Sequence, residues 1–222
     1  MHIMEGYLPV SHSVLWTAAM SPFWGYGIYR LKKIVSEKPN SRLLLGAAGG
    51  YSMLLSSLKL PSVTGSSSHL TGVGFGAILY GPGVMFILGT IVLLFQALLL
   101  AHGGISTLGA NAFSMVVVGG FAAYGVFRLL RSFKLPLSVS VFIATMLSSI
   151  STYLMTSLQL AIAHHSQEGI FEAFIKFFSI FAITQIPLAV SEGLFTVLII
   201  NALLHVSRDD VVEPGVISGG IK

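Results

Sequence analysis

No charged side chain occurs between Lys59 and Arg128, and this uncharged run constrains the fold more than any other feature of the sequence. A soluble domain carries roughly 25% charged residues, whereas only 9% of these 222 residues are charged and 54% are hydrophobic. In a bilayer the backbone has no water to bind, so the segments that cross it must be helices or a closed barrel. The apolar stretches here have the length of helices. The sequence therefore predicts an all-α integral membrane protein.

The apolar stretches predict about seven transmembrane helical segments in one compact bundle, since a crossing needs ~20 apolar residues. The stretch from Val73 to Ala101 is long and contains Gly81-Pro82-Gly83, which is typical of a turn, so we expect it to cross twice or to dip in and out. Its halves are short, and one of them should be sheltered by protein. The apolar stretches are Val10–Tyr29, Leu43–Leu58, Val73–Ala101, Ala112–Phe127, Leu137–Ala163 and Ile170–Leu204.

Basic residues set the expected topology. Cytoplasmic loops carry an excess of Lys and Arg, and the segment from Arg30 to Arg42 carries five basic residues and one acidic residue. This places that loop inside, the N-terminus outside and the polar, serine-rich loop 61–71 outside. The basic segment from Arg128 to Lys134 should also be inside. The net charge of +4 therefore marks orientation in a membrane and gives no reason to expect a nucleic-acid partner.

The Met1-His2 start can chelate a metal ion with the chain's own end. The α-amine of Met1, the backbone nitrogen of His2 and His2 Nδ1 close one five-membered and one six-membered ring, and they leave one corner of a square. Planar all-nitrogen sites suit Ni²⁺ or Cu²⁺. We therefore expect the transported ion to be Ni²⁺ or Co²⁺, and we favour nickel. We expect the fourth ligand to be His69, which the topology places on the same side of the membrane. An ordinary solvated loop histidine is the alternative.

Other polar residues are candidates for supporting this site. Hydroxyls beside His69 can orient a ligand ring, and buried amides can form a network behind it. His102 begins a glycine-rich outer turn, where it is either a relay ligand or, as we favour, bonded to the loop backbone. Glu192 lies in an apolar stretch, where a charge is usually functional. The supporting candidates are Ser66, Ser68, His102, Gln96 and Asn111.

Four segments in order resemble the CbiM/NikM family, the cobalt/nickel substrate-binding membrane subunits of energy-coupling-factor (ECF) transporters. The resemblance implies capture of Ni²⁺ or Co²⁺ at the outer face, with ligands at Met1, His2 and His69. It also implies partners: a transmembrane coupling subunit, ATPase subunits and room for an extra small membrane subunit. The segments are MHIMEGYLP (1–9), PSVTGSSSHLTG (61–72), FQALLLAHGG with TLGAN (95–104, 107–111), and TQIP with EG (184–187, 192–193).

We therefore expect residues 1–206 to form one membrane domain with the metal site at its outer face, and residues 207–222 to form a flexible cytoplasmic tail. The setting is the cytoplasmic membrane of a prokaryote, in contact with lipid. No P-loop motif is present, so an ATPase would be a partner chain and this chain is not itself expected to be an enzyme.

Two alternatives stay open. One is a self-sufficient metal permease with Glu192 as its proton site. The other is an intramembrane serine hydrolase that uses a serine of 66–68 with His69 or His102.

Overall fold

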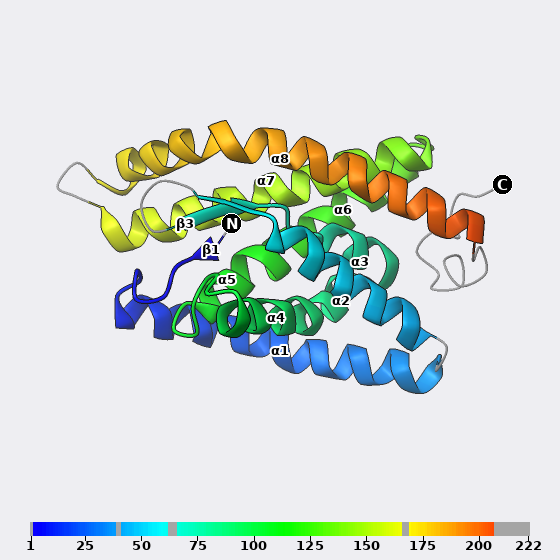
Figure 1. Cartoon of the computed structure of the whole chain (residues 1–222), viewed down its shortest axis with the longest axis horizontal. Coiled ribbons are helices and arrows are strands. Elements are labelled where there is room, and N and C mark those ends of the chain that lie inside the picture. Colours follow the sequence, from blue (N-terminus) through cyan, green and yellow to red (C-terminus); the bar gives the residue numbers. More distant parts are fainter. Residues whose placement is uncertain (1, 39–40, 62–65, 166–168, 207–222) are drawn as a thin grey trace.

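The computed structural model describes residues 2–38, 41–61, 66–165 and 169–206. In this part of the chain the fold is seven helical segments with one small sheet toward one end (Figure 1). One segment runs through α5, a π-helical turn η1 and α6 without a break. The all-α membrane architecture expected from the sequence is confirmed, and the predicted tail 207–222 lies outside the described residues. The helices are α1 (Val10–Glu37), α2 (Ser41–Ser57), α3 (Val73–Tyr80), α4 (Pro82–Leu99), α5 (Leu108–Ala112), η1 (Phe113–Val118), α6 (Gly119–Ser132), α7 (Leu137–His164) and α8 (Ile170–Val206).

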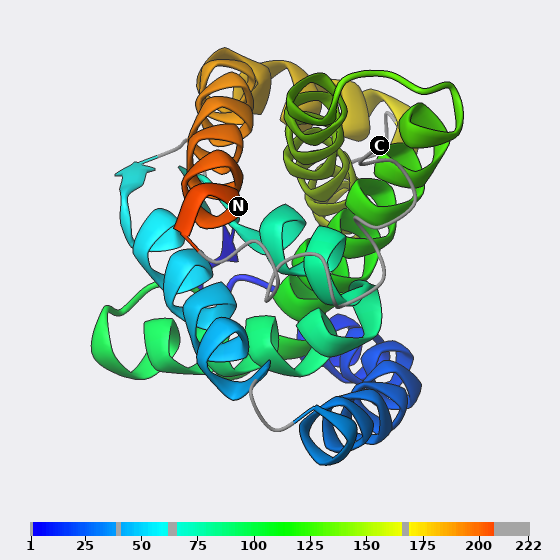
Figure 2. The same cartoon turned by 90° about the vertical axis from the view of Figure 1, so that its right-hand side faces the viewer.

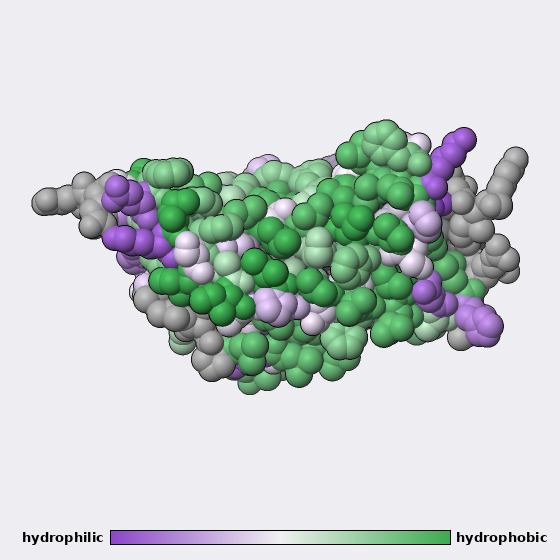
Figure 3. Space-filling model, turned by 90° about the horizontal axis from the view of Figure 1, so that it is seen from above, coloured by the Kyte–Doolittle hydropathy of each residue, from purple (hydrophilic) through white to green (hydrophobic). Residues whose placement is uncertain are grey.

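Four helices of the described chain are long and apolar enough to cross a membrane: Pro82–Leu99, Leu108–Ser132, Leu137–His164 and Ile170–His205. The surface agrees with this assignment. Figure 3 shows hydrophobic residues over the middle of one long face and hydrophilic residues gathered toward its two ends. A band of this kind is what a lipid-facing surface requires. The protein is therefore a multi-pass membrane protein.

The stretch Val73–Ala101 divides where the sequence predicted a turn. Gly81 separates α3 from α4 with a φ of +83°, a conformation that favours glycine. Helix α3 has only 8 residues, or ~12 Å of helix, too little to cross a bilayer alone. Every residue of α3 is buried, which confirms that one half is sheltered by protein.

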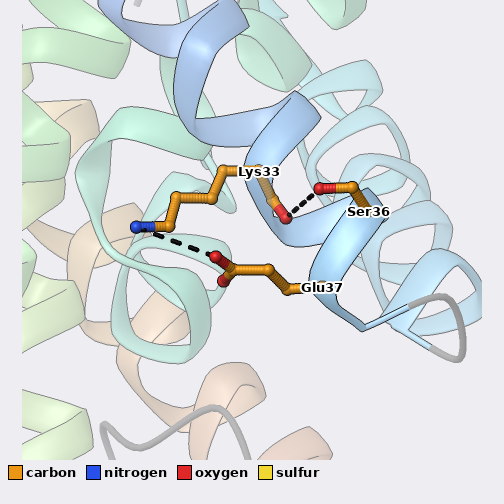
Figure 4. Close-up of polar contacts among 3 residues, drawn as sticks. All are labelled: Lys33, Ser36 and Glu37. Atoms are coloured by element: carbon orange, nitrogen blue, oxygen red, sulfur yellow. Dashed lines mark hydrogen bonds and ion pairs between the residues drawn. The ribbon is translucent and has the colours of Figure 1, made fainter.

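The two basic segments lie at the same end of the bundle. One hydrophobic cluster joins Ile34 near the end of α1, Leu44 at the start of α2, Phe127 near the end of α6 and Leu137 at the start of α7. The last turns of α1 extend past the apolar stretch and carry charges. There an exposed Lys33–Glu37 pair lies at 3.8 Å, next to Ser36 (Figure 4).

Helix α7 buries an unusual number of hydroxyl groups. Thr145, Thr152, Thr156 and Ser157 are fully buried, and each donates a hydrogen bond of 2.9–3.0 Å to the carbonyl four residues earlier in the same helix. These hydroxyls are satisfied without a partner helix. Their small side chains also allow close packing in a membrane.

A three-stranded sheet lies at the opposite end from the basic segments. Its order is β1-β3-β2, with β1 (His2–Ile3), β2 (Lys59–Pro61) and β3 (Ser66–His69) paired antiparallel. Figure 2, which looks along the helices, shows the N-terminal strand inside the ring of helices. The polar loop expected over 61–71 is wrong for the described part, because residues 66–69 form a strand. Ser68, His69 and Thr71 are fully buried.

Candidate metal centre

Three histidines from distant parts of the chain meet beside the sheet. His2 lies on β1, His69 ends β3, and His102 follows α4 in the loop before α5. Their candidate ligand atoms all lie within 4.8 Å of one another, and none of the three residues is more than 2% exposed. Three convergent, buried imidazoles are a common metal-binding arrangement.

Burial keeps these rings in the form that binds metal. Desolvation lowers the pKa of His2 and of His69 well below 6.5, and it lowers the pKa of His102 to about 3. A neutral imidazole has one bare nitrogen, and only a bare nitrogen can bind a cation. The three imidazoles are therefore neutral at physiological pH.

His69 has the hydrogen-bond pattern of a metal ligand. Its Nδ1 lies 2.6 Å from the carbonyl oxygen of Leu70, and a carbonyl only accepts, so Nδ1 carries the hydrogen. Its Nε2 is then bare, and this buried atom has no hydrogen-bond partner among the described residues. Metal-binding histidines usually donate their other ring N–H to a backbone carbonyl or carboxylate in this way.

His102 has a different pattern. Its Nε2 lies 2.7 Å from Ser67 Oγ and 3.0 Å from His2 Nδ1, while its Nδ1 has no partner in the described part of the chain. The expectation that this ring bonds to the loop backbone is therefore wrong. A hydrolytic Ser–His pair needs a third group on the far ring nitrogen, and no such group is described here.

The rings also differ in orientation. His2 and His69 are stacked, with centroids 4.2 Å apart and planes 20° apart. The ring of His102 is nearly perpendicular to both, at 89° and 86°. His69 and His102 thus approach His2 from different directions.

The strand that carries His2 is held by the loop and helix after α4. The side chain of Asn111 accepts a hydrogen bond from Ile3 N at 2.8 Å and donates one to Ile3 O at 3.0 Å. Thr107 Oγ1 donates to the same Ile3 carbonyl at 2.8 Å. Further along, Glu5 N donates to Gly103 O at 3.2 Å. The N-terminal strand is therefore fixed on the side that faces away from β3.

The strand that carries His69 is held by α8. Thr184 and Ser68 share a hydroxyl–hydroxyl bond of 2.8 Å, and Gln185 Nε2 donates to His69 O at 3.3 Å. Below the strand, the Glu192 carboxylate accepts hydrogen bonds from Thr71 N, Thr71 Oγ1 and Gly72 N at 2.6–2.8 Å. Glu192 thus stabilises the turn that follows His69.

The structure brings some of the residues singled out from the sequence together and gives others a supporting position. His2 and His69 come together with His102, while Met1 lies outside the described residues. Asn111 acts on the backbone next to His2. Gln96 supports the loop of His102, because its carbonyl accepts from His102 N at 3.1 Å and its side chain bonds to Ser56.

The two serines singled out from the sequence differ in what the structure describes. Ser68 bonds to α8 rather than to an imidazole. Ser66 pairs with Ile3 through the sheet, and its side chain is outside the described residues.

Ser67 was not among the supporting residues expected from the sequence, although a signal for it was available. Side chains alternate between the two faces of a strand, so in a strand 66–69 Ser67 shares a face with His69. Treating this segment as a loop concealed that alternation. The exposed pair His164 and His165 does not join the cluster.

Comparison with known proteins gives consistent matches. Residues 2–209 match a family described as "Cobalt uptake substrate-specific transmembrane region". The chain is 55% identical over 218 residues to "Cobalt transport protein CbiM" of Streptomyces coelicolor, covering 98% of this chain and 94% of that protein. It is 56% identical over 206 residues to the protein of the same name from Limosilactobacillus reuteri, covering 92% of this chain and 83% of that protein.

Two solved structures share the fold. One is described as the crystal structure of a truncated transition metal transporter; it has a TM-score of 0.80 and 27% identity, and the match covers 92% of this chain and 99% of that one. The other is described as a transition metal transporter, with a TM-score of 0.81, 25% identity and 96% coverage of both chains.

Proposed function

This chain belongs to the family of cobalt uptake substrate-specific transmembrane regions, and from that premise we propose that it is the substrate-binding subunit of an ATP-driven ECF-type transporter that imports Co²⁺ or Ni²⁺. The observation that carries the proposal is the buried cluster of His2, His69 and His102. The names of the relatives support transport of cobalt. They favour a transporter over an enzyme.

In the proposed site the ion is held by the Met1 amine, the backbone nitrogen and Nδ1 of His2, and Nε2 of His69. The bare, buried Nε2 of His69 supports its part in this set. A candidate ligand atom of His102 lies within 4.8 Å of those of His2 and His69, and His102 Nε2 contacts His2 Nδ1. We assign it a supporting role, because its Nε2 contacts Ser67 Oγ and His2 Nδ1 and can therefore orient the ring of His2.

We propose that both ions are bound and that nickel is bound more tightly than cobalt. Four nitrogens in one plane suit Ni²⁺, and affinity for a given nitrogen site rises from Co²⁺ to Ni²⁺ to Cu²⁺. Selectivity against copper would then depend on availability. Competition between Co²⁺ and Ni²⁺ for the purified protein measures this order directly.

The energy for import would come from partner chains. We propose a transmembrane coupling subunit and ATPase subunits, with room for an extra small membrane subunit. The protein would lie in the cytoplasmic membrane of a prokaryote with the sheet end outside and the basic end inside, as the positive-inside rule requires.

The decisive experiment blocks the N-terminal amine. Acetylation of Met1 keeps every side chain but removes the amine lone pair, so the purified protein should lose tight binding of nickel and cobalt. A chain with one Gly before Met1 should still bind through a different four-nitrogen square, with His69 no longer needed. His164→Ala, which removes an exposed imidazole, is the control and should keep full metal content. Normal binding and transport by the acetylated protein would overturn the chelate.

A secondary permease is the alternative, with the buried Glu192 as its proton site. Its carboxylate is engaged by the backbone N–H groups of Thr71 and Gly72, which favours a structural role over proton transport. Uptake of ⁵⁷Co²⁺ by cells that express this chain alone, with ATP depleted, would support the permease. The ECF proposal predicts that such uptake is absent.

A further inference from the structure

We infer that Asn111 is the positioning residue of the metal site: its carboxamide acts as a neighbouring strand for Ile3 and thereby fixes where His2 lies. The inference rests on the proposed function for the identity of the cargo. Its structural part stands on the contacts of Ile3 alone.

The two hydrogen bonds fix the orientation of the amide. Ile3 N can only donate, so the atom 2.8 Å from it must be the Asn111 carbonyl oxygen. Ile3 O can only accept, so the atom 3.0 Å from it must be the amide nitrogen. That nitrogen also lies 3.2 Å from Thr107 Oγ1. A side-chain amide that meets both backbone groups of one residue reproduces the pairing of an antiparallel strand.

Burial makes this pairing necessary. Ile3 is fully buried, and Asn111 and Thr107 are at most 1% exposed. Strand β1 has only 2 residues, so the sheet alone gives it few hydrogen bonds. Without Asn111 the N–H of Ile3 would be buried without a partner, and a buried donor left unpaired is costly.

The pairing acts on the metal site through one peptide bond. Ile3 N belongs to the peptide group that joins His2 to Ile3, so holding that atom holds the Cα from which the His2 imidazole projects. The opposite edge of β1 pairs with β3, where His2 is opposite Ser67. The His2 ring is thus placed against His69 and His102 by a strand with fixed neighbours on both edges. A shift of β1 by one residue would turn the His2 side chain to the other face of the sheet.

The test compares substitutions that remove different parts of the amide. Asn111→Ala removes both hydrogen bonds. Asn111→Asp keeps the shape and the acceptor for Ile3 N but turns an oxygen toward Ile3 O. Ser106→Ala is the control, since the Ser106 hydroxyl contacts the same N-terminal segment only in exposed positions, at Gly6 N (3.4 Å) and at the Glu5 carboxylate.

The first readout is the affinity for Ni²⁺ and Co²⁺, measured by competition with a chelator. Loss of a group that orients a metal ligand typically costs 10–100-fold in affinity, so Asn111→Ala should bind ~10–100-fold more weakly, and Asn111→Asp should fall between it and the wild type. Ser106→Ala should differ by less than ~2-fold. At saturating Ni²⁺ the absorption spectrum of Asn111→Ala should match that of the wild type, because the ligands are unchanged. His69→Ala should alter that spectrum.

The second readout needs no metal. In protein labelled with ¹⁵N-isoleucine, the amide of Ile3 should exchange with solvent at least ~10-fold faster in Asn111→Ala than in the wild type, while the isoleucines of α8 keep their rates. This arm separates the two proposals. If acetylation of Met1 leaves binding intact, the chelate is wrong, yet faster exchange at Ile3 would still support Asn111. If acetylation abolishes binding but Asn111→Ala matches the wild type in affinity and exchange, the positioning role is refuted.

Discussion

Glu192→Ala is expected to destabilise the turn that follows His69 and to weaken metal binding with it. The carboxylate accepts hydrogen bonds from Thr71 N and Gly72 N, each at 2.8 Å, and from Thr71 Oγ1 at 2.6 Å. Glu192 and Thr71 are fully buried, so neither backbone N–H can turn to water instead. The contacts of the described residues identify no other acceptor for these two N–H groups.

The magnitude follows from the groups left unpaired. A buried donor that loses its acceptor costs ~1–3 kcal/mol, so two backbone N–H groups cost ~2–6 kcal/mol in the free energy of unfolding. The hydroxyl of Thr71 can rotate and adds little. Glu192→Gln keeps one carbonyl oxygen and should lose about half as much.

The assay is thermal unfolding of the purified protein in detergent, followed by Ni²⁺ affinity of the folded fraction. Ser191→Ala is the control, because the Ser191 hydroxyl is exposed and bonds to Pro187 O within its own helix. If Glu192→Ala unfolds and binds metal like Ser191→Ala, the carboxylate does not support the turn and this reasoning is wrong.

Three further predictions follow from the site. His69→Ala should lower Ni²⁺ affinity by at least ~100-fold, measured by competition with a chelator, because one of the four proposed nitrogen ligands is lost. Gly104→Ala should weaken metal binding without unfolding the bundle, since the added methyl group would lie 2.6 Å from Glu5 Cα and displace the N-terminal segment; Gly125→Ala, where nothing lies within 4 Å, should bind like the wild type in the same titration. The affinity for Ni²⁺ should rise with pH between about 7 and 8.5, where the Met1 amine (pKa ~7.7–8.0) loses its proton. It should change less near pH 6.5, because burial has already lowered the imidazole pKa values. Isothermal titration across this range would refute the account if the steepest change in affinity lay near pH 6.5.

The fold was largely predictable because lipid simplifies the problem. Apolar length and the placement of Lys and Arg gave the helices, and Gly81 gave the turn between α3 and α4. The sheet was not predictable in the same way. The run from Ser66 to His69 is small and polar and looks like a solvated loop, and it becomes a strand only because β1 and β2 pair with both of its edges.

The candidate site was predictable only in part, for a related reason. His2 and His69 belong to chemistry that residue type and chain position suggest. His102 is 100 residues from His2, and no periodic pattern links them, because the loop after α4 is brought back to the sheet by the whole path of α3 and α4. The role of Asn111 depends on the backbone of Ile3, which a sequence does not display.

The hydroxyl-rich helix α7 has a consequence for how such a chain is made. Thr152 and Thr156 bond within their own helix, so α7 can enter lipid with these hydroxyls already paired. Ser148 and Tyr153 of the same helix donate to carbonyls of α6 and α8 and pair only after those helices have associated. Asn111, Gln185 and Glu192 find their partners on other segments, and they reach those partners only after the helices have gathered. In a two-stage assembly of insertion followed by association, the helices would form first. The end that holds the histidine cluster would take its structure last, when the N-terminal strand packs into the assembled bundle.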